Sequence, residues 1–276
     1  MTGSPLLRVS SPRLEAFLDA GPPDIGTVWE LCMYFEFDQA KTVDGIAEWL
    51  GPPPDLRVLD CACGSGFPAL GLIAKGYDVT CTDGSETMLK HFRRNARLEG
   101  LDVQPHQLRW EELPLRYAGQ FDVVLNRGCG NYRYAGVWDG GGLASRQAMA
   151  HAIRQWVTCI RPGGRLYIDI PREEPPAAAP PEITRRPALL VGGHTVEMAE
   201  RIAVDPGSGI RTWTIWLTLD GAGYEFERRA HHIRHKELVA ILISCGLVDV
   251  NQIDIPGEYY DVFCAIRPEG RQEGRS

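Results

Sequence analysis

The sequence predicts a doubly wound α/β fold, in which one mostly parallel sheet carries a small antiparallel β insertion. Two observations support this fold class. In the first two thirds of the chain, short apolar runs recur between helical patterns, as expected for parallel strands buried on both faces. After a Pro- and Ala-rich segment at 173–187, apolar and polar residues alternate instead, which is typical of antiparallel strands with one solvated face.

The core elements follow in chain order. Five strands are expected at 57–60, 78–83, 103–108, 122–126 and 165–170, with helices at 68–75, 86–98 and 145–160 between several of them. A helix at 236–245 precedes two closing strands at 248–255 and 259–266. Because alternating strands and helices build parallel sheets, the seven strands predict a Rossmann-like, mostly parallel seven-stranded sheet.

The remaining segments flank this core. Residues 1–26 are expected to be irregular, because Pro12, Pro22 and Pro23 interrupt any long helix. Three alternating strands are expected at 194–204, 211–219 and 224–235, separated by turns rich in Asp and Gly. The predicted organisation is therefore a lid or arm at 1–45, a core at 46–173 and 236–270, and an antiparallel substrate-cap insertion at 174–235.

Composition narrows the classes of function. The 29 basic and 36 acidic residues give a net charge of -7, without the basic clusters that nucleic acid phosphates require. The first residues lack the pattern of a secretory signal, and no stretch of about 18 apolar residues occurs, so no membrane partner and a cytoplasmic location are expected. The eight cysteines never form a CxxC motif, and we expect reduced core thiols and no metal.

A glycine turn after the first core strand predicts a nucleotide site. Gly64 and Gly66 let the backbone approach a ligand closely, and Asp83 at the end of the next strand is placed to bind ribose hydroxyls. This spacing also fits a dinucleotide site, so an NAD-dependent oxidoreductase is an alternative. The extra acid Asp60 favours S-adenosylmethionine, because that cofactor brings a sulfonium and an ammonium that a carboxylate can balance.

Two longer stretches resemble a known family. LDCACGSG at 59–66 and GYDVTCTDGSETMLK at 76–90 resemble motifs of class I S-adenosylmethionine-dependent methyltransferases, particularly the glycine N-methyltransferase and glycine/sarcosine N-methyltransferase family. The resemblance covers roughly 27–173. It implies a cofactor site formed by Trp29, Asp60, Ala62, Gly64, Gly66, Asp83, Gly84, Met88, Arg109, Trp110, Arg127 and Gly128.

One departure from the family concerns the carboxylate of the cofactor's methionyl group. The family has an arginine about ten residues after the tryptophan that Trp29 resembles, whereas this chain reads Asp-Gln-Ala-Lys at 38–41. The positive charge is therefore expected from Lys41, Gln39 being the polar alternative, or from elsewhere in the chain.

The acceptor site is expected over the carboxyl ends of the strands, because ligands of open α/β sheets bind there. This places four residues after the fourth strand and one after the fifth near the transferred methyl group: Asn131, Tyr132, Arg133, Tyr134 and Arg172. In the inserted strands, alternation directs Glu200 and His232 to apolar faces. We predict them, with Tyr34, as catalytic candidates; ordinary structural pairing of a buried acid and histidine is the alternative.

The predicted function is S-adenosylmethionine-dependent methyl transfer, which leaves S-adenosylhomocysteine. The acceptor is expected to be a small amino-acid-derived metabolite that is methylated on nitrogen or on an electron-rich, indole-like carbon. An aromatic set, Trp29, Tyr34, Phe35, Phe37, Trp213 and Trp216, suggests a pocket larger than glycine needs, although these residues could equally form core. A glycine/sarcosine-type N-methyltransferase and a non-catalytic binding module are alternatives, and a homo-oligomer is compatible with the sequence.

Overall fold

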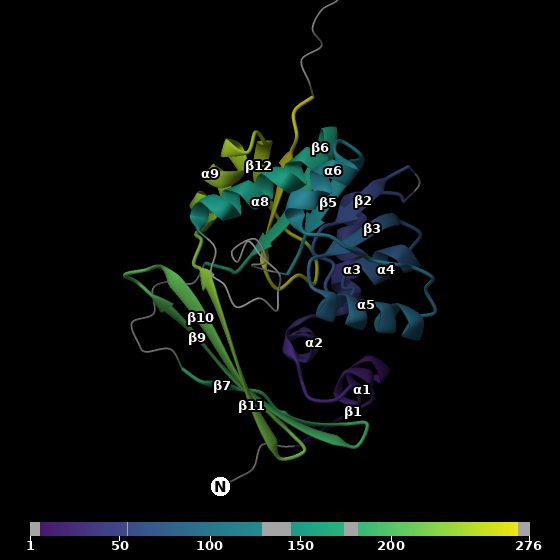
Figure 1. Cartoon of the computed structure of the whole chain (residues 1–276), viewed down its shortest axis with the longest axis vertical. Coiled ribbons are helices and arrows are strands. Elements are labelled where there is room, and N and C mark those ends of the chain that lie inside the picture. Colours follow the sequence, from purple (N-terminus) through teal and green to yellow (C-terminus); the bar gives the residue numbers. More distant parts are fainter. Residues whose placement is uncertain (1–5, 54, 129–144, 174–181, 270–276) are drawn as a thin grey trace, which may run out of the picture.

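The core of the protein is a seven-stranded sheet with the order β12-β13-β6-β5-β2-β3-β4. A computed structural model describes residues 6–53, 55–128, 145–173 and 182–269 (Figure 1). The β2–β3, β2–β5, β3–β4 and β5–β6 pairs are parallel, whereas β13 runs antiparallel to β6 and to β12. The predicted fold class is confirmed. The strands are β2 (Arg57–Asp60), β3 (Asp78–Asp83), β4 (His106–Gln107), β5 (Phe121–Asn126), β6 (Ile160–Ile170), β12 (Val248–Ile253) and β13 (Asp261–Ile266).

Helices cover both faces of this sheet. One apolar cluster joins Leu59 of β2 to α6 (Leu113–Tyr117), α8 (Arg146–Cys159) and α9 (His235–Ser244). A second joins the neighbouring Val58 to α3 (Gln39–Leu50), α4 (Ala69–Ala74) and α5 (Glu86–Leu98). Adjacent residues of β2 therefore bury opposite faces, which explains why Val58 and Leu59 are both apolar.

The chain order places a ligand crevice in the middle of the core sheet. From β2 the chain passes to β3 and β4 on one side, and later to β5 and β6 on the other. The carboxyl ends of β2 and β5 lie side by side at this switch point, where the flanking loops separate. The segments after Asp60 and after Asn126 consequently border one space.

A second sheet has the order β1-β8-β9-β10-β11, with β7 on β9. The three predicted antiparallel strands are confirmed as β9 (His194–Asp205), β10 (Ile210–Leu219) and β11 (Ala222–His231). The sequence did not predict β7 (Thr184–Arg185), β8 (Ala188–Val191) or β1 (Leu6–Val9), which pairs in parallel with β8. The insertion is therefore completed by the N-terminal end of the chain.

The expectation that residues 1–26 are irregular is wrong. Helix α1 (Pro12–Leu18) begins with Pro12 in its first turn, where proline is compatible with a helix because that amide needs no helical partner. Ser11 accepts a hydrogen bond from the Leu14 amide and caps the helix. Helix α2 (Ile25–Glu36) begins with a capping box formed by Asp24 and Thr27.

Helices α1 and α2 lie between the second sheet and α5 (Figure 1). Leu14 and Leu31 of these helices share an apolar cluster with Val196 and Ile215 of the sheet. The N-terminal segment therefore forms part of the core of the second sheet.

Two further expectations concern the chain as a whole. None of the described helices is long and apolar enough to cross a membrane. The seven described cysteines are free thiols, and five of them are buried, as expected for core residues.

Candidate functional site

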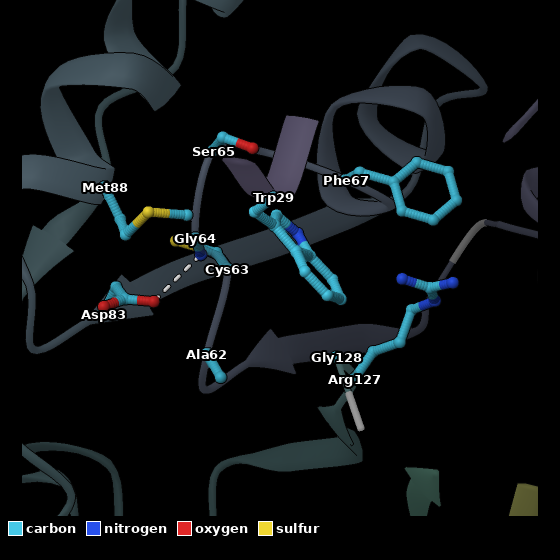
Figure 2. A pocket seen from close by; sticks show the side chains of 10 residues that line it. All are labelled: Trp29, Ala62, Cys63, Gly64, Ser65, Phe67, Asp83, Met88, Arg127 and Gly128. Carbon is cyan, nitrogen blue, oxygen red and sulfur yellow. Dashed lines mark hydrogen bonds between the residues drawn. The ribbon is translucent and has the colours of Figure 1, made fainter. Parts of the chain in front are cut away.

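A cavity lies at the carboxyl ends of β2, β3 and β5, where ligands of open α/β sheets bind (Figure 2). Seven of its lining residues were predicted: Trp29, Ala62, Gly64, Asp83, Met88, Arg127 and Gly128. Three were not: Cys63, Ser65 and Phe67. The sequence motif indicated the loop that holds these three, but not which of its side chains face the cavity.

The glycines of the loop after β2 are required by its conformation. Gly64 and Gly66 have φ angles of +51° and +111°, in the region that disfavours side chains. A Cβ atom on Gly66 would lie 2.5 Å from Cδ1 of Leu70, which is buried. The Gly64 amide donates a hydrogen bond of 2.9 Å to Oδ2 of Asp83, so the loop is joined to the end of β3.

Gly66→Ala is expected to lower the free energy of unfolding by roughly 1–3 kcal/mol for the positive φ, and further for the collision with Leu70. Gly76→Ala is the matched control, because Gly76 has a φ of +91° but nothing within 4 Å of the added Cβ. Urea unfolding of both variants measures the difference. Equal losses would contradict the crowding argument.

Asp83 and Met88 form one end of the cavity (Figure 2). The Asp83 carboxylate is held by two backbone amides, Gly64 to Oδ2 at 2.9 Å and Ser85 to Oδ1 at 2.8 Å. Met88 lies in the first turn of α5 and is 3% exposed. The fixed carboxylate can accept hydrogen bonds from ribose hydroxyls, and the apolar thioether can pack against a flat base. This end of the cavity therefore suits a nucleoside.

Asp60 lies directly behind the cavity lining. Its carboxyl is buried, and Oδ1 accepts a hydrogen bond of 3.1 Å from the Ala62 amide. Its other oxygen, Oδ2, is buried without a hydrogen-bond partner among the described residues. Burial raises the pKa of Asp60 from 3.8 to about 7. A buried carboxylate oxygen of this kind calls for a ligand that donates to it.

Arg127, at the tip of β5, forms the opposite end of the cavity (Figure 2). Its guanidinium makes two hydrogen bonds of 2.9 Å to Glu258 and lies 4.6 Å from the ring centroid of Phe37 and 4.4 Å from that of Phe67. Burial opposes the charge, but Glu258 and Asp169 outweigh it and raise the pKa of Arg127. The arginine is therefore a fixed cation.

The described charges around the cavity are predominantly negative. Asp169 is buried, and its Oδ2 accepts a hydrogen bond of 2.9 Å from the Gly128 amide. Asp83 lines the crevice, Asp60 and Asp169 are buried behind it on the amides of Ala62 and Gly128, and Glu258 compensates Arg127. This arrangement favours a cationic ligand over a pyrophosphate, and so favours a methyl donor over a dinucleotide.

Five predicted cofactor residues do not line the cavity. These are Asp60 behind it, the glycines Gly66 and Gly84, and the pair Arg109 and Trp110. The Trp110 indole donates a hydrogen bond of 2.8 Å to the Cys61 carbonyl, and its ring packs on Trp156. Arg109 is exposed. The cofactor roles of Arg109 and Trp110 stay predictions.

The structure narrows the choice of the residue that could bind the carboxylate of the cofactor's methionyl group. Lys41 is exposed and Gln39 is half-buried in the first turn of α3, and neither lines the cavity. Among the described lining residues, Arg127 alone carries a cationic side chain. Arg127 is therefore the described residue that could supply this charge from elsewhere in the chain, and its role stays a prediction.

The acceptor side is only partly described. Asn131, Tyr132, Arg133 and Tyr134 lie outside the described residues. The Arg172 side chain is 62% exposed and donates a hydrogen bond of 3.3 Å to the Glu258 carbonyl. Tyr34 is exposed on α2. Of the described candidates, neither Arg172 nor Tyr34 lines the cavity.

Glu200 has structural partners. Its Oε1 accepts a hydrogen bond of 2.9 Å from Nε of Arg186, and its Oε2 accepts one of 2.8 Å from the Trp213 indole. Arg186 also contacts Glu36 of α2. Both oxygens of Glu200 are thus engaged, which favours ordinary structural pairing over a role as general base.

The predicted strand that carries His232 is too long. Strand β11 ends at His231, and the His232 amide donates a hydrogen bond of 2.8 Å to the Gly209 carbonyl. The side chains of Arg228 and Ala230 are buried, as the alternation predicts, but Ile233 is buried next, out of phase with them. The assignment of His232 to the apolar face of a strand is therefore wrong, and its catalytic role stays a prediction.

The predicted aromatic set does not form one pocket. Trp29 lines the cofactor cavity, and Phe37 packs against Arg127. Trp213 belongs to the cluster between α2 and the second sheet. Trp216 bonds to Glu225, an exposed residue beside it on the sheet. These aromatic residues therefore do not support the expectation of a large aromatic pocket for the acceptor.

Known proteins resemble parts of the sequence. A family model described as a methyltransferase domain matches residues 58–164. Glycine/sarcosine N-methyltransferase of Parasynechococcus marenigrum is 40% identical over 68 residues, which cover 25% of this chain and 24% of that protein. Human glycine N-methyltransferase is 33% identical over 122 residues, 41% of this chain and 40% of that protein. The match thus spans well under half of these curated relatives.

Solved structures share the fold over most of the chain. DesVI of Streptomyces venezuelae superposes with a TM-score of 0.69 and 19% identity, covering 90% of this chain and 100% of that one. The sugar N-methyltransferase KedS8 of Streptoalloteichus gives a TM-score of 0.68 and 19% identity, covering 90% and 95%. Residues 58–164 therefore match a methyltransferase domain, and the fold of these solved structures extends over most of the chain.

Proposed function

We propose that this protein transfers a methyl group from S-adenosylmethionine to a nitrogen atom of a small-molecule acceptor. The observation that carries the proposal is the buried, unpartnered oxygen of Asp60 behind a crevice whose described charges are predominantly negative. That environment fits a ligand with a sulfonium and an ammonium group. When bound, the cofactor supplies an electrophilic methyl group.

We assign the adenosine and the methionyl carboxylate of the cofactor to opposite ends of the cavity. Asp83 and Met88 would hold the adenosine, and Arg127 would face the methionyl carboxylate. Asp60 would accept a hydrogen bond from the ammonium, and Trp29 would cover the cofactor. These side chains would orient the donor and exclude water, which is most of what methyl transfer asks of a protein.

Nitrogen is favoured as the acceptor atom by two considerations. Curated relatives include N-methyltransferases of glycine and sarcosine beside ubiquinone biosynthesis O-methyltransferases, and the structural neighbours include a sugar N-methyltransferase. An amine can also lose its proton before it binds, whereas a ring carbon benefits from a nearby base. The engaged oxygens of Glu200 make that residue a poor base.

A methyl-transfer screen tests the proposal. Glycine, sarcosine, an aminosugar and tryptophan-derived compounds are offered with S-adenosylmethionine, and products are read by mass and fragmentation. N-methylated product with one acceptor class is the expected result. Carbon methylation would move the function to the indole-type alternative, and donor binding without product from a broad panel would favour a binding module.

Two substitutions separate binding from turnover. Asp83→Ala is expected to raise the donor Kd between about tenfold and a hundredfold, because a charged hydrogen-bond acceptor is removed. His232→Ala, by contrast, is expected to leave the donor Kd within about twofold, so that a loss of kcat in this variant reports on the acceptor side. Calorimetry and turnover with the best acceptor measure both quantities. Equal effects of the two variants on Kd and kcat would contradict these roles.

A further inference from the structure

One buried carboxylate joins the N-terminal helices to the glycine loop. Glu30 of α2 is 2% exposed, and its carboxylate pairs with the guanidinium of Arg13 in α1. Its Oε2 also accepts a hydrogen bond of 3.2 Å from the hydroxyl of Ser65, which lies between Gly64 and Gly66. Helix α1, helix α2 and the glycine loop therefore meet at this one side chain.

The neighbours of Glu30 and Ser65 are cavity residues. Trp29 precedes Glu30 on the same turn of α2 and lies across the cavity between Gly64 and Arg127 (Figure 2). Ser65 lines the cavity, and its carbonyl accepts a hydrogen bond of 2.8 Å from the Asn95 side chain of α5. One turn of α2 thus covers the cavity and holds the loop that lines it.

A second set of contacts attaches the same helices to α5, which carries Met88 into the cavity. Asp24, before α2, lies 2.8 Å from Nε2 of His91. The carbonyl of Ala16 accepts a hydrogen bond of 2.6 Å from Arg94. Phe17 of α1 stacks on His91 with ring centroids 4.3 Å apart. The N-terminal helices are therefore docked on two elements that each line the cofactor cavity.

Burial makes these contacts cooperative. If α1 left its place alone, Glu30 would keep a buried carboxylate without its guanidinium partner, which is costly. The unit formed by α1 and α2, which stays packed on the second sheet, is therefore expected to undock from the glycine loop as one body. Undocking removes Trp29 from the cavity and releases the hydroxyl of Ser65.

We propose that Glu30 is a positioning residue that couples docking of the α1–α2 unit to occupation of the methyl-donor site. This inference rests on the function proposed above. By linkage, whatever favours the docked unit tightens donor binding, and the bound donor favours docking by the same factor. Glu30 acts through Trp29 and Ser65.

Glu30→Gln tests the proposal, because it keeps the shape and the acceptor for Ser65 but removes the charge that pairs with Arg13. Asp44→Asn is the control, since it removes a carboxylate from the exposed ion pair with Lys75. The readouts are the Kd of S-adenosylhomocysteine by calorimetry, the rate of trypsin cleavage after Arg13 with and without that ligand, and thermal unfolding. The single variant Arg13→Gln and the double variant Arg13→Gln/Glu30→Gln complete a cycle that is read by the Kd and by thermal unfolding, because both lack the cleavage site at residue 13.

In the wild type and in Asp44→Asn, the ligand is expected to slow cleavage after Arg13. Glu30→Gln is expected to raise the Kd between about fivefold and 150-fold and to lose that protection. The double variant should bind no more weakly than Glu30→Gln, because both changes break one interaction. A wild-type Kd in Glu30→Gln, or a lower melting temperature with an unchanged Kd, would overturn the inference.

Ser65→Ala keeps the test decisive if Glu30→Gln does not fold. It removes only the hydroxyl that joins the loop to Glu30, and it should raise the Kd severalfold with partial loss of protection. Unchanged binding and protection in Ser65→Ala would overturn the inference. A wild-type protein that does not bind S-adenosylhomocysteine at all would instead overturn the proposed function.

Discussion

Asp60→Asn is expected to weaken donor binding while making the ligand-free protein less sensitive to alkaline pH. The amide cannot balance the positive groups of S-adenosylmethionine, so the donor Kd should rise between about tenfold and a hundredfold. The wild-type carboxyl, by contrast, must ionise without a partner for Oδ2, which is why burial raises its pKa to about 7. Asparagine removes that cost.

The sign of the pH effect follows from the raised pKa. An acid with a folded-state pKa above its unfolded value of 3.8 contributes stability that is present below pH 3.8 and is lost as pH rises to about 7. Between pH 5 and pH 8 this loss amounts to at most about 3 kcal/mol. Between pH 5 and pH 8 the free energy of unfolding of the wild type should therefore fall relative to that of Asp60→Asn by up to this amount. Urea unfolding of both proteins at both pH values measures the difference.

The affinity for the donor is also expected to depend on pH in the wild type and not in Asp60→Asn. Because the cation needs ionised Asp60, the wild-type donor Kd should rise as pH falls below about 7, and the Kd of Asp60→Asn should stay flat. Calorimetry from pH 5.5 to 8 measures both. Parallel curves for the two proteins would exclude Asp60 as the group that meets the cation.

Glu258→Gln is expected to lower the free energy of unfolding by about 3–5 kcal/mol, because it leaves the buried guanidinium of Arg127 without its counter-charge. The lost ion pair also frees Arg127 to move out of the cavity, so donor binding should weaken. Urea unfolding and calorimetry measure the two effects.

An exposed pair provides the control for this substitution. Glu86→Gln makes the same chemical change in the ion pair with Arg93, whose side chains are 42% and 34% exposed, and should cost at most about 1 kcal/mol. The double variant Arg127→Met/Glu258→Leu should recover most of the stability without recovering donor binding. If Glu258→Gln and Glu86→Gln lower the free energy of unfolding equally, the buried ion pair of Arg127 and Glu258 does not stabilise the fold around the cavity.

The sequence predicted the parts of the molecule that depend on local pattern. The strands at 57–60 and 78–83 and the helix at 86–98 have the expected bounds, because apolar runs and helical periodicity reflect burial directly. The glycine turn also pointed to Asp83 and Met88, which line the cavity beside it, because the turn fixes which strand end and which helix start lie next to the loop.

The parts that depend on distant contacts were missed. Glu258 is 131 residues from Arg127, and Arg13 is 52 residues from Ser65, and no periodicity relates such pairs. Strand β1 is too short to show alternation and forms only because β8 offers it an edge. Glu200 was placed on the correct, buried face, but its partners Arg186 and Trp213 could be seen only in the folded chain.

Calorimetric titration of the wild-type protein at pH 8 with S-adenosylmethionine, S-adenosylhomocysteine and NAD tests the central claim most directly. The predominantly negative crevice with ionised Asp60 predicts one site per chain for the two adenosyl ligands, with S-adenosylmethionine losing affinity as pH falls below about 7. NAD should not bind. Binding of NAD without either adenosyl ligand would contradict the account.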